Sequence, residues 1–286
     1  MPAKAEAQGA SDPGAEAIAL KSFIINELGV PHAFLGRGWT DPAGVVGLGE
    51  ESAPPALSAW LIDTVYPRRW AWIREPDAWV RPAAAEIQAS APRHLARARQ
   101  VHGCGVWTSG VAAKGSADSA ALGPEADAVV SRDPGLAVAV ITADCVPVLL
   151  AGAGGGEVAA VHAGWRGLLA GVIEAAVAAV TPPITAAVGP CITAEAFEVG
   201  PEVAERFDAA VVRWPSGSGR PHVDLVAEAV RRLGAAGVDR VDHGGASHPC
   251  TYGRADRYYS YRREVSHGGA KRTGRNWSVI APRPVG

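Results

Sequence analysis

Residues 136–167 read LAVAVITADCVPVLLAGAGGGEVAAVHAGWRG, and this stretch decides the fold. Its aliphatic and β-branched runs over Leu136–Thr142, Val146–Leu150 and Val158–Val161 are typical of buried strands. Ala-Asp-Cys at residues 143–145 and the glycines of residues 152–156 interrupt these runs and favour turns. The stretch therefore predicts three successive strands that are separated by polar turns.

The flanking sequence continues this alternation of short elements. Helices are expected over residues 167–180, 201–210 and 223–233, the last with Asp224 as N-cap, and further strands over residues 128–131, 184–188 and 238–241. No repeat or linker divides the chain. We therefore expect one α+β domain over residues 21–286, preceded by a mobile tail, rich in alanine, glycine and acidic residues, over residues 1–20.

The composition limits the classes of function. The 286 residues include 27 Lys and Arg against 29 Asp and Glu, so no basic excess attracts nucleic acid or anionic membranes. The longest uncharged stretch, Ala175–Ala194, contains three prolines and cannot form a membrane-spanning helix. A secretory signal is not recognisable, and four cysteines are too few for a disulfide framework. We expect a cytoplasmic protein, and the sequence does not define its oligomeric state.

Three polar segments place reactive side chains beside glycine or at the ends of apolar runs. They contain His102, Cys145 and His162. Two imidazoles and a thiolate suffice for a catalytic zinc ion, which uses three protein ligands and keeps one position for water or substrate. The separations of 43 and 17 residues match no zinc-finger spacing. The residue types and their positions at strand ends therefore motivate the site, with buried cysteine and hydrogen-bonded histidine as the alternatives.

Several strings of the sequence resemble, in the same order, the YfiH-like family, which is also called the laccase-domain family. They are RQVHG (99–103), ADAVVS (126–131), TADCVPVLL (142–150), VHAGWRG (161–167), GPCI (189–192), FEVGPEV (197–203), CTY (250–252), YYSYRRE (258–264) and TGR (273–275). The resemblance runs from about residue 97 to residue 280.

This resemblance implies a mixed α+β fold in which sheets and helices form layers, and a zinc ion held by His102, Cys145 and His162. It also implies phosphorolysis of adenosine, inosine, guanosine and methylthioadenosine, together with adenosine deamination. Purine nucleosides and phosphate are then the partners. The family's older name, copper oxidase, suits the chain less well, because a trinuclear copper centre needs more clustered histidines than a chain with eight provides.

Three further residues are candidates for the chemistry. Phosphorolysis needs a pocket for phosphate, and arginine can bind phosphate oxygens through two hydrogen bonds, so Arg37 and Arg166 are the candidates. As a residue at a helix start, Arg166 could instead form a local salt bridge. Deamination needs a carboxylate that moves protons. Asp144 is the nearest in sequence to Cys145, although strand alternation could point it away.

The N-terminal third departs from the family's pattern and leaves two other functions open. The family's Ser-Leu-Asn-Leu-Gly run appears only as Val46–Gly49, without the asparagine. If His102 or His162 activated Cys145 as a nucleophile, the chain would be a cysteine hydrolase acting on an amide such as a cell-wall precursor. The altered motifs and the tryptophan-rich segment 54–80 also fit a catalytically weak binding or scaffold protein.

The C-terminal motifs carry one more structural expectation. Tyr258, Tyr259 and Tyr261, followed by two arginines, alternate like a strand with one packed face. Of the other cysteines, Cys191 follows Gly-Pro in an apolar context and is expected to pack in the core.

Overall fold

The computed structural model describes residues 19–20, 30, 32–36, 73–75, 78–80, 94–109, 121–214 and 219–283. Nearly all of the expected tail, Arg37 and most of the tryptophan-rich segment lie outside these residues. The domain boundaries at residues 20 and 21 therefore stay predictions.

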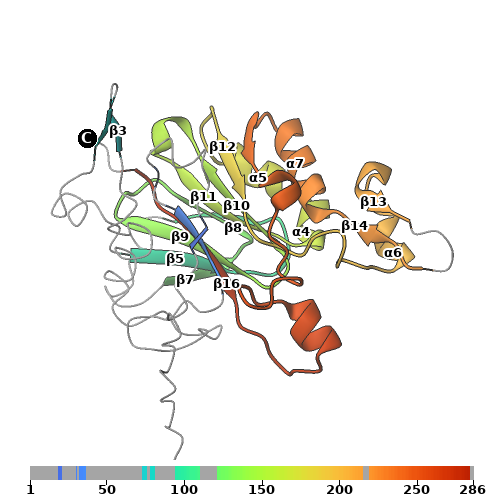
Figure 1. The fold of residues 1–286 in the computed structure, drawn as a ribbon. Helices are drawn as coiled ribbons and strands as arrows, with labels where there is room; N and C mark the ends of the chain where they lie inside the picture. The colour runs from blue at the N-terminus through green and yellow to red at the C-terminus, as the bar shows by residue number, and fades with distance from the viewer. Residues whose placement is uncertain are drawn as a thin grey trace, which may run out of the picture.

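Two six-stranded sheets form the centre of the molecule (Figure 1). The first has the order β1 (Ala19–Leu20), β2 (His32–Leu35), β16 (Asn276–Ile280), β9 (Leu136–Thr142), β5 (His94–Arg99) and β7 (Ala121–Glu125). The second has the order β15 (Arg240–Asp242), β12 (Thr185–Val188), β10 (Val146–Ala151), β11 (Val158–Ala163), β8 (Ala128–Ser131) and β6 (Val106–Thr108). Both sheets mix parallel and antiparallel pairs. Two hairpins, β3 (Ile73–Glu75) with β4 (Ala78–Val80) and β13 (Val212–Arg213) with β14 (His222–Val223), complete the strands.

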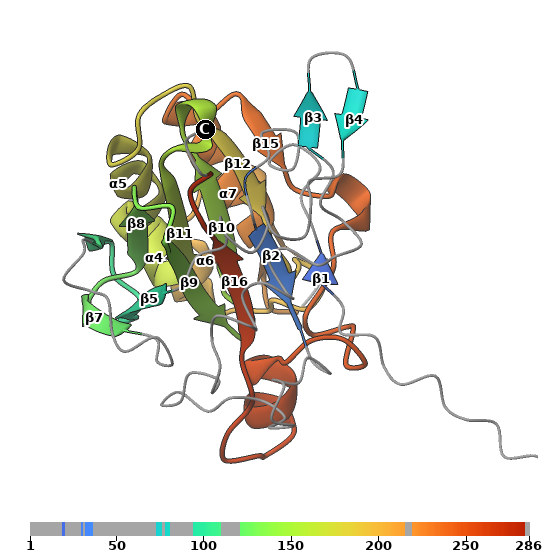
Figure 2. The same cartoon turned by 90° about the vertical axis from the view of Figure 1, so that its left-hand side faces the viewer.

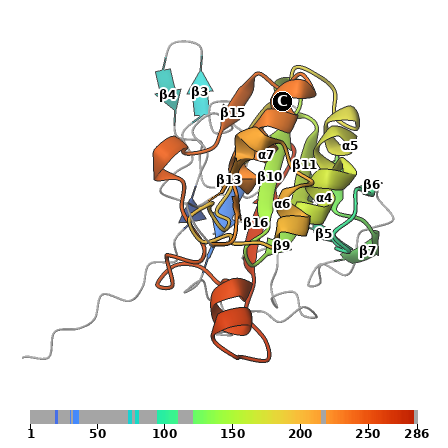
Figure 3. The same ribbon diagram turned by 90° about the vertical axis from the view of Figure 1, so that its right-hand side faces the viewer.

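Helices cover one face of the second sheet. These are α4 (Trp165–Ala170), α5 (Val172–Ala178) and α7 (Leu225–Ala235), which lie in front of β10 and β11 in Figure 3. The short helix α6 (Pro201–Ala204) lies beside the β13–β14 hairpin (Figure 1). No helix in the described part of the chain is long and apolar enough to cross a membrane.

The second sheet lies between the first sheet and the helices, and this position explains why its strands are continuous apolar runs in the sequence. In β11, Val158 and Ala160 belong to the core that the two sheets share, together with Val138 of β9. Their neighbours Ala159 and Val161 point the other way, into the core beneath the helices. Because both faces of this sheet are covered (Figure 2), apolar residues occupy every position of β10 and β11 except that of His162. The expected α+β class with layered sheets and helices is confirmed.

Three expected elements differ from the structure. The single helix over residues 167–180 is two helices, because Gly171 has φ of 90° and ends α4 in the left-handed conformation. The helix over residues 201–210 is reduced to α6 and a 3₁₀ turn over Ala209–Val211, which Asp208 caps. Residues 258–263 do not form a strand, since Arg262–His267 is a π-helix. The N-cap at Asp224 is confirmed, as its carboxylate accepts a hydrogen bond from the N–H of Ala227 at 2.9 Å.

Gly189 tests the packing of the first sheet against the second, and Gly234 provides the comparison. A Cβ on Gly189, which follows β12, would overlap the buried ring of Phe34 from β2. A Cβ on Gly234 in α7 would meet nothing within 4 Å. We expect Gly189→Ala to lower the free energy of unfolding by about 1–3 kcal/mol, and Gly234→Ala to raise it by about 0.5–1 kcal/mol. Chemical denaturation measures both values, and an unchanged Gly189→Ala protein would contradict this packing.

Candidate metal centre

The structure brings His102, Cys145 and His162 together. Their ligand atoms all lie within 4.8 Å of one another, and the two imidazole rings meet edge to face with centroids 4.8 Å apart. His102 is exposed, Cys145 is half-buried and His162 is buried. In the described part of the chain, no other three His, Cys, Asp or Glu residues are grouped in this way. Three side chains that are 60 residues apart at most in sequence thus form one cluster at the surface.

The strand topology produces this convergence. His102 follows β5 of the first sheet, and His162 lies in β11 of the second. Cys145 lies in the turn where the chain leaves β9 in the first sheet and enters β10 in the second. Because β10 and β11 pair antiparallel, with Pro147 opposite His162, the start of β10 carries Cys145 next to the end of β11. The cluster therefore lies where the two sheets are joined.

A buried carboxylate, which the sequence analysis did not select, supports two of the three residues. Asp127 has no solvent exposure, and its Oδ1 lies 2.7 Å from Nδ1 of His162. The same carboxylate accepts hydrogen bonds from the backbone N–H groups of Val101, His102 and Gly103 at 3.2, 2.9 and 2.7 Å. With Nδ1 directed at Asp127, His162 would bind a metal ion through Nε2, and the ion would displace the proton from that nitrogen.

The loop that carries His102 is fixed at a second point. The side chain of Gln100 pairs with the backbone of Ile141 in β9, donating to its carbonyl at 2.7 Å and accepting from its N–H at 2.8 Å. His102 itself has φ of 61°, a left-handed conformation that costs a non-glycine residue about 1–3 kcal/mol. The hydrogen bonds that Asp127 accepts from the loop and those that Gln100 forms with Ile141 hold the loop in this conformation.

Two glycines leave the space beside the cluster open. A Cβ on Gly164 would lie 3.0 Å from Sγ of Cys145 and 3.0 Å from Cδ2 of His102. A Cβ on Gly167 would lie 2.9 Å from the carbonyl oxygen of Gly103. Any larger residue at position 164 would enter the space beside the sulfur and the imidazole.

The charges of the cluster support one another. Burial alone would lower the pKa of His162, but the Cys145 sulfur and the Asp127 carboxylate raise it to about 9. Burial alone would raise the pKa of Cys145, but His162 and His102 lower it to about 6. Burial also opposes ionisation of Asp127, yet His162 and the Gly103 N–H hold the pKa of this carboxyl below its ordinary value. The site therefore favours a thiolate at neutral pH, which is the form that binds metal ions.

The donor atoms suit zinc. Two imidazole nitrogens and one thiolate are a common set of donors for this ion, and the three atoms lie within 4.8 Å of one another. The carboxylate behind His162 supplies the outer support that metal-bound histidines usually have. The three residues of the cluster thus fit a zinc ion.

The other predicted site residues are placed differently. Arg37 lies outside the described residues. Arg166 is exposed in the first turn of α4, three residues after Ala163 at the end of β11, and its guanidinium carbon lies 4.3 Å from the ring centroid of Trp165. Among the residues that the structure describes, no carboxylate pairs with Arg166. Asp144 is buried beside Cys145, and both of its oxygens accept hydrogen bonds from the C-terminal segment. The roles given to these residues stay predictions.

These features define a layered α+β protein with a surface cluster of two histidines and one cysteine at the junction of two sheets. Residues 78–283 match the model of a family described as multi-copper polyphenol oxidoreductase laccase. The chain belongs to this family, which is the YfiH-like, laccase-domain family that the sequence motifs resemble.

Individual relatives agree with this assignment. A purine nucleoside phosphorylase YfiH from Escherichia coli is 43% identical over 162 residues, which are 54% of this chain and 63% of the relative. The match thus spans less than two thirds of that protein. A purine nucleoside phosphorylase from Deinococcus radiodurans is 37% identical over 276 residues, covering 91% of this chain and 92% of the relative. A crystal structure of a Neisseria meningitidis protein of the DUF152 family aligns with a TM-score of 0.59 and 31% identity, covering 88% and 99% of the two chains.

Asp127 offers a test of the support behind the ligands. We expect Asp127→Asn to weaken zinc binding by about 10–100-fold. The carboxylate now accepts hydrogen bonds from three backbone N–H groups, whereas the NH₂ group of asparagine is a donor and would face other donors. Competition with a chromophoric chelator measures this affinity. Asp208→Asn, which alters an exposed cap of a 3₁₀ turn, is the control and should bind zinc like the unchanged protein. Equal affinities for the two variants would contradict the role of Asp127.

The pKa of Cys145 offers a second test, made on protein stripped of metal. Iodoacetamide reacts with the thiolate, whose fraction rises with pH, so alkylation of Cys145 should reach half its maximal rate near pH 6 and be close to maximal at pH 7. His162→Gln should move the midpoint upward, since it removes the main group that lowers this pKa. Mass spectrometry of the peptide that contains Cys145 gives the rate. A midpoint in the ordinary range of a free thiol would show that the imidazole does not act on the sulfur.

Proposed function

We propose that this chain is a zinc-dependent purine nucleoside phosphorylase that acts on adenosine, inosine, guanosine and methylthioadenosine. The convergence of His102, Cys145 and His162 in front of Asp127 carries the proposal. The names of the relatives from Escherichia coli and Deinococcus radiodurans support the reaction. A multi-copper oxidase is less well supported, since the described residues hold one cluster of three ligands and multi-copper centres need several.

The reaction replaces one bond at the ribose. An oxygen of phosphate forms a bond to the anomeric carbon, the bond from this carbon to the purine nitrogen breaks, and the purine leaves with a proton. A zinc ion held by His102, Cys145 and His162 would supply a Lewis acid that orients and polarises the substrate. Asp127 keeps His162 in the orientation that presents Nε2.

Arg166 and Arg37 are the candidates for binding phosphate. Arg166 follows His162 by four residues and has no carboxylate partner in the described part of the chain, so its guanidinium is available to an anion. Its contact with the ring of Trp165 restricts the side chain and favours a fixed orientation. A guanidinium can donate two parallel hydrogen bonds to phosphate oxygens.

Adenosine deamination is a second activity that we propose for the same centre. The sequence makes Asp144, the carboxylate adjacent to Cys145 in the chain, the candidate for its proton transfer. Both oxygens of this carboxylate are occupied by hydrogen bonds, which leaves it poorly placed to exchange protons with a substrate. Formation of inosine from adenosine without phosphate is the measurement for this activity.

A cysteine hydrolase is the alternative that a specific observation favours. The lowered pKa of Cys145, the adjacent His162 and the carboxylate of Asp127 behind this imidazole are the three parts of an activated cysteine nucleophile. Such an enzyme would be active without metal and inactivated by alkylation of Cys145. A zinc phosphorylase would lose activity on chelation, so metal removal distinguishes the two functions.

The decisive assay measures phosphate-dependent release of base from a nucleoside panel, with the metal content of the protein determined in parallel. Single alanine variants of His102, Cys145 and His162 should lose both the metal and the activity, because each removes one of three ligands. Full metal content in all three variants would contradict the assignment of the ligands, and base release without phosphate would contradict phosphorolysis.

The same assay tests the arginines. We expect Arg166→Met to raise the apparent KM for phosphate by about 10–100-fold, as the loss of a charge-assisted hydrogen bond predicts, with a smaller change in the KM for the nucleoside. Arg37→Met tests the second candidate. Arg132→Met is the control, because this arginine forms a surface pair with Glu157 at 2.7 Å. Unchanged phosphate dependence in both test variants would place the phosphate site elsewhere.

A further inference from the structure

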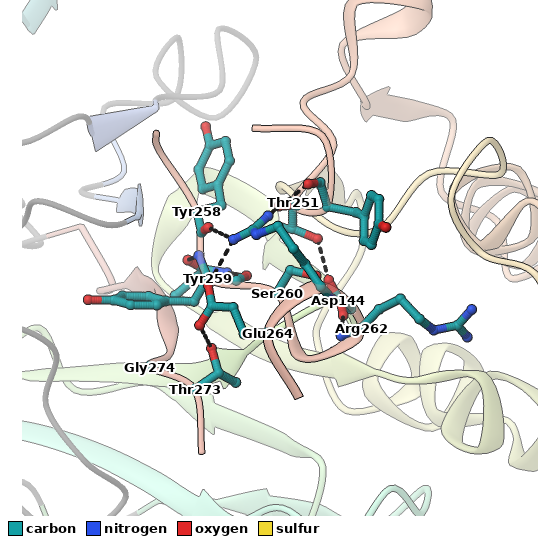
Figure 4. Close-up of polar contacts among 12 residues, drawn as sticks. Asp144, Thr251, Tyr258, Tyr259, Ser260, Arg262, Glu264, Thr273 and Gly274 are labelled. Carbon is teal, nitrogen blue, oxygen red and sulfur yellow. Dashed lines mark hydrogen bonds and ion pairs between the residues drawn. The ribbon is translucent and has the colours of Figure 1, made fainter. Parts of the chain in front are cut away.

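Asp144 connects the turn that carries Cys145 to a segment more than 100 residues further along the chain. Its side chain is buried, and its Oδ1 accepts a hydrogen bond from the hydroxyl of Thr251 at 2.7 Å (Figure 4). Its Oδ2 accepts a hydrogen bond from the backbone N–H of Arg262 at 2.7 Å. The backbone carbonyl of Asp144 accepts a third, from the N–H of Ile192 at 3.0 Å.

The backbone of Asp144 needs such support. Its φ of 98° lies in the left-handed region, where a non-glycine residue costs about 1–3 kcal/mol and persists only when its surroundings hold it. Asp144 precedes Cys145 directly, so its backbone angles set the direction in which the Cys145 side chain leaves the chain. Relaxation at Asp144 would therefore move the sulfur away from the two imidazoles.

The segment that holds Asp144 is itself firmly fixed. The guanidinium of Arg263 donates hydrogen bonds to the carbonyl oxygens of Thr251 at 2.5 Å, Tyr252 at 2.8 Å and Tyr258 at 2.7 Å. It also pairs with Glu264 at 2.8 Å. Thr251 has no solvent exposure. The side chain of Arg263 thus ties Thr251 to the segment that contains Arg262, so the two groups that donate to Asp144 form a single unit.

We propose that Asp144 is a positioning residue for the metal ligand Cys145, and that Thr251 and the start of the Arg262–His267 helix act on the metal centre through it. This inference rests on the proposed metal centre, and it gives Asp144 a role other than proton transfer. The motifs at residues 250–252 and 258–264 then serve the metal site from a distance, without contributing a ligand.

The test changes Thr251, which is fully buried and is not one of the three proposed ligands. Thr251→Val keeps the shape of the side chain and removes the hydroxyl that donates to Asp144. We expect zinc affinity, measured by chelator competition, to fall by about 10–100-fold, the usual effect of losing an outer support of a metal ligand. Thr251→Ser, which keeps the hydroxyl, should restore the affinity.

Thr273→Val is the matched control. This threonine lies in the same C-terminal segment and also donates its hydroxyl to a carboxylate, that of Glu264, but it does not contact Asp144. It should leave zinc affinity unchanged. Thermal unfolding of both variants shows whether they are folded. An equal loss of affinity in Thr251→Val and Thr273→Val, or no loss in Thr251→Val, would overturn the proposal.

A measurement without metal separates this inference from the proposed function. Hydrogen exchange of the peptide that spans residues 142–146, followed in metal-free protein, should be faster in Thr251→Val than in Thr273→Val. If the unchanged protein bound no zinc, the proposal of a metal centre would be wrong. The exchange rates would still decide whether Thr251 holds the turn at residues 143–145. Equal exchange rates in the two variants would count against the positioning role.

Discussion

The carboxylate of Asp127 is the group on which the arrangement of the site depends. It is fully buried, and such a charge is tolerated only when donors surround it. The imidazole of His162 and three consecutive backbone N–H groups provide these donors. Because the donors come from the loop after β5 and from β11, one side chain at the entrance to β8 fixes elements of both sheets. This single anion therefore fixes His162 and the backbone of His102, which are two of the three residues of the cluster.

The turn that contains His102 and the turn that contains Cys145 are stabilised in the same way. Each contains one non-glycine residue with positive φ, His102 in the first and Asp144 in the second. In each, a buried carboxylate accepts several hydrogen bonds that hold the turn. Asp127 acts on its turn from outside, whereas Asp144 acts on its own turn by binding the C-terminal segment. The strained backbone at His102 and Asp144 is thereby held by hydrogen bonds to the two buried carboxylates.

Local pattern predicted the central strands and one helix cap well. Leu136–Thr142 is found as expected, because an apolar run bounded by turn residues leaves little choice for a chain that must bury it. Asp224 was recognisable as an N-cap from its position before an apolar helix. His102, Cys145 and His162 were selected by residue type and by resemblance, and their spacing in sequence contained no sign of convergence, which depends on how the strands pair.

Other features depend on tertiary contacts that no local pattern records. Asp127 stands in an ordinary Ala-Asp-Ala sequence at the start of a buried strand, and its role becomes visible only when the loop after β5 folds over it. The tyrosines before Arg262 alternate like a strand, yet the segment is irregular and continues into a π-helix. Its Arg262 N–H donates to Asp144, and its Tyr258 carbonyl accepts from Arg263. In both cases, partners distant in sequence override the local preference.

The origin of the ligands has a thermodynamic consequence. His102 lies in the connection from β5 of the first sheet to β6 of the second, Cys145 lies in the later connection from β9 to β10, and His162 lies in β11. The unfolded chain therefore contains no preformed site. An ion bound at this junction would select the folded state by mass action, adding about 2.7 kcal/mol to the free energy of unfolding at a concentration one hundred times its dissociation constant. Loss of such an ion would remove this contribution, and the contacts between the two sheets would then open more often.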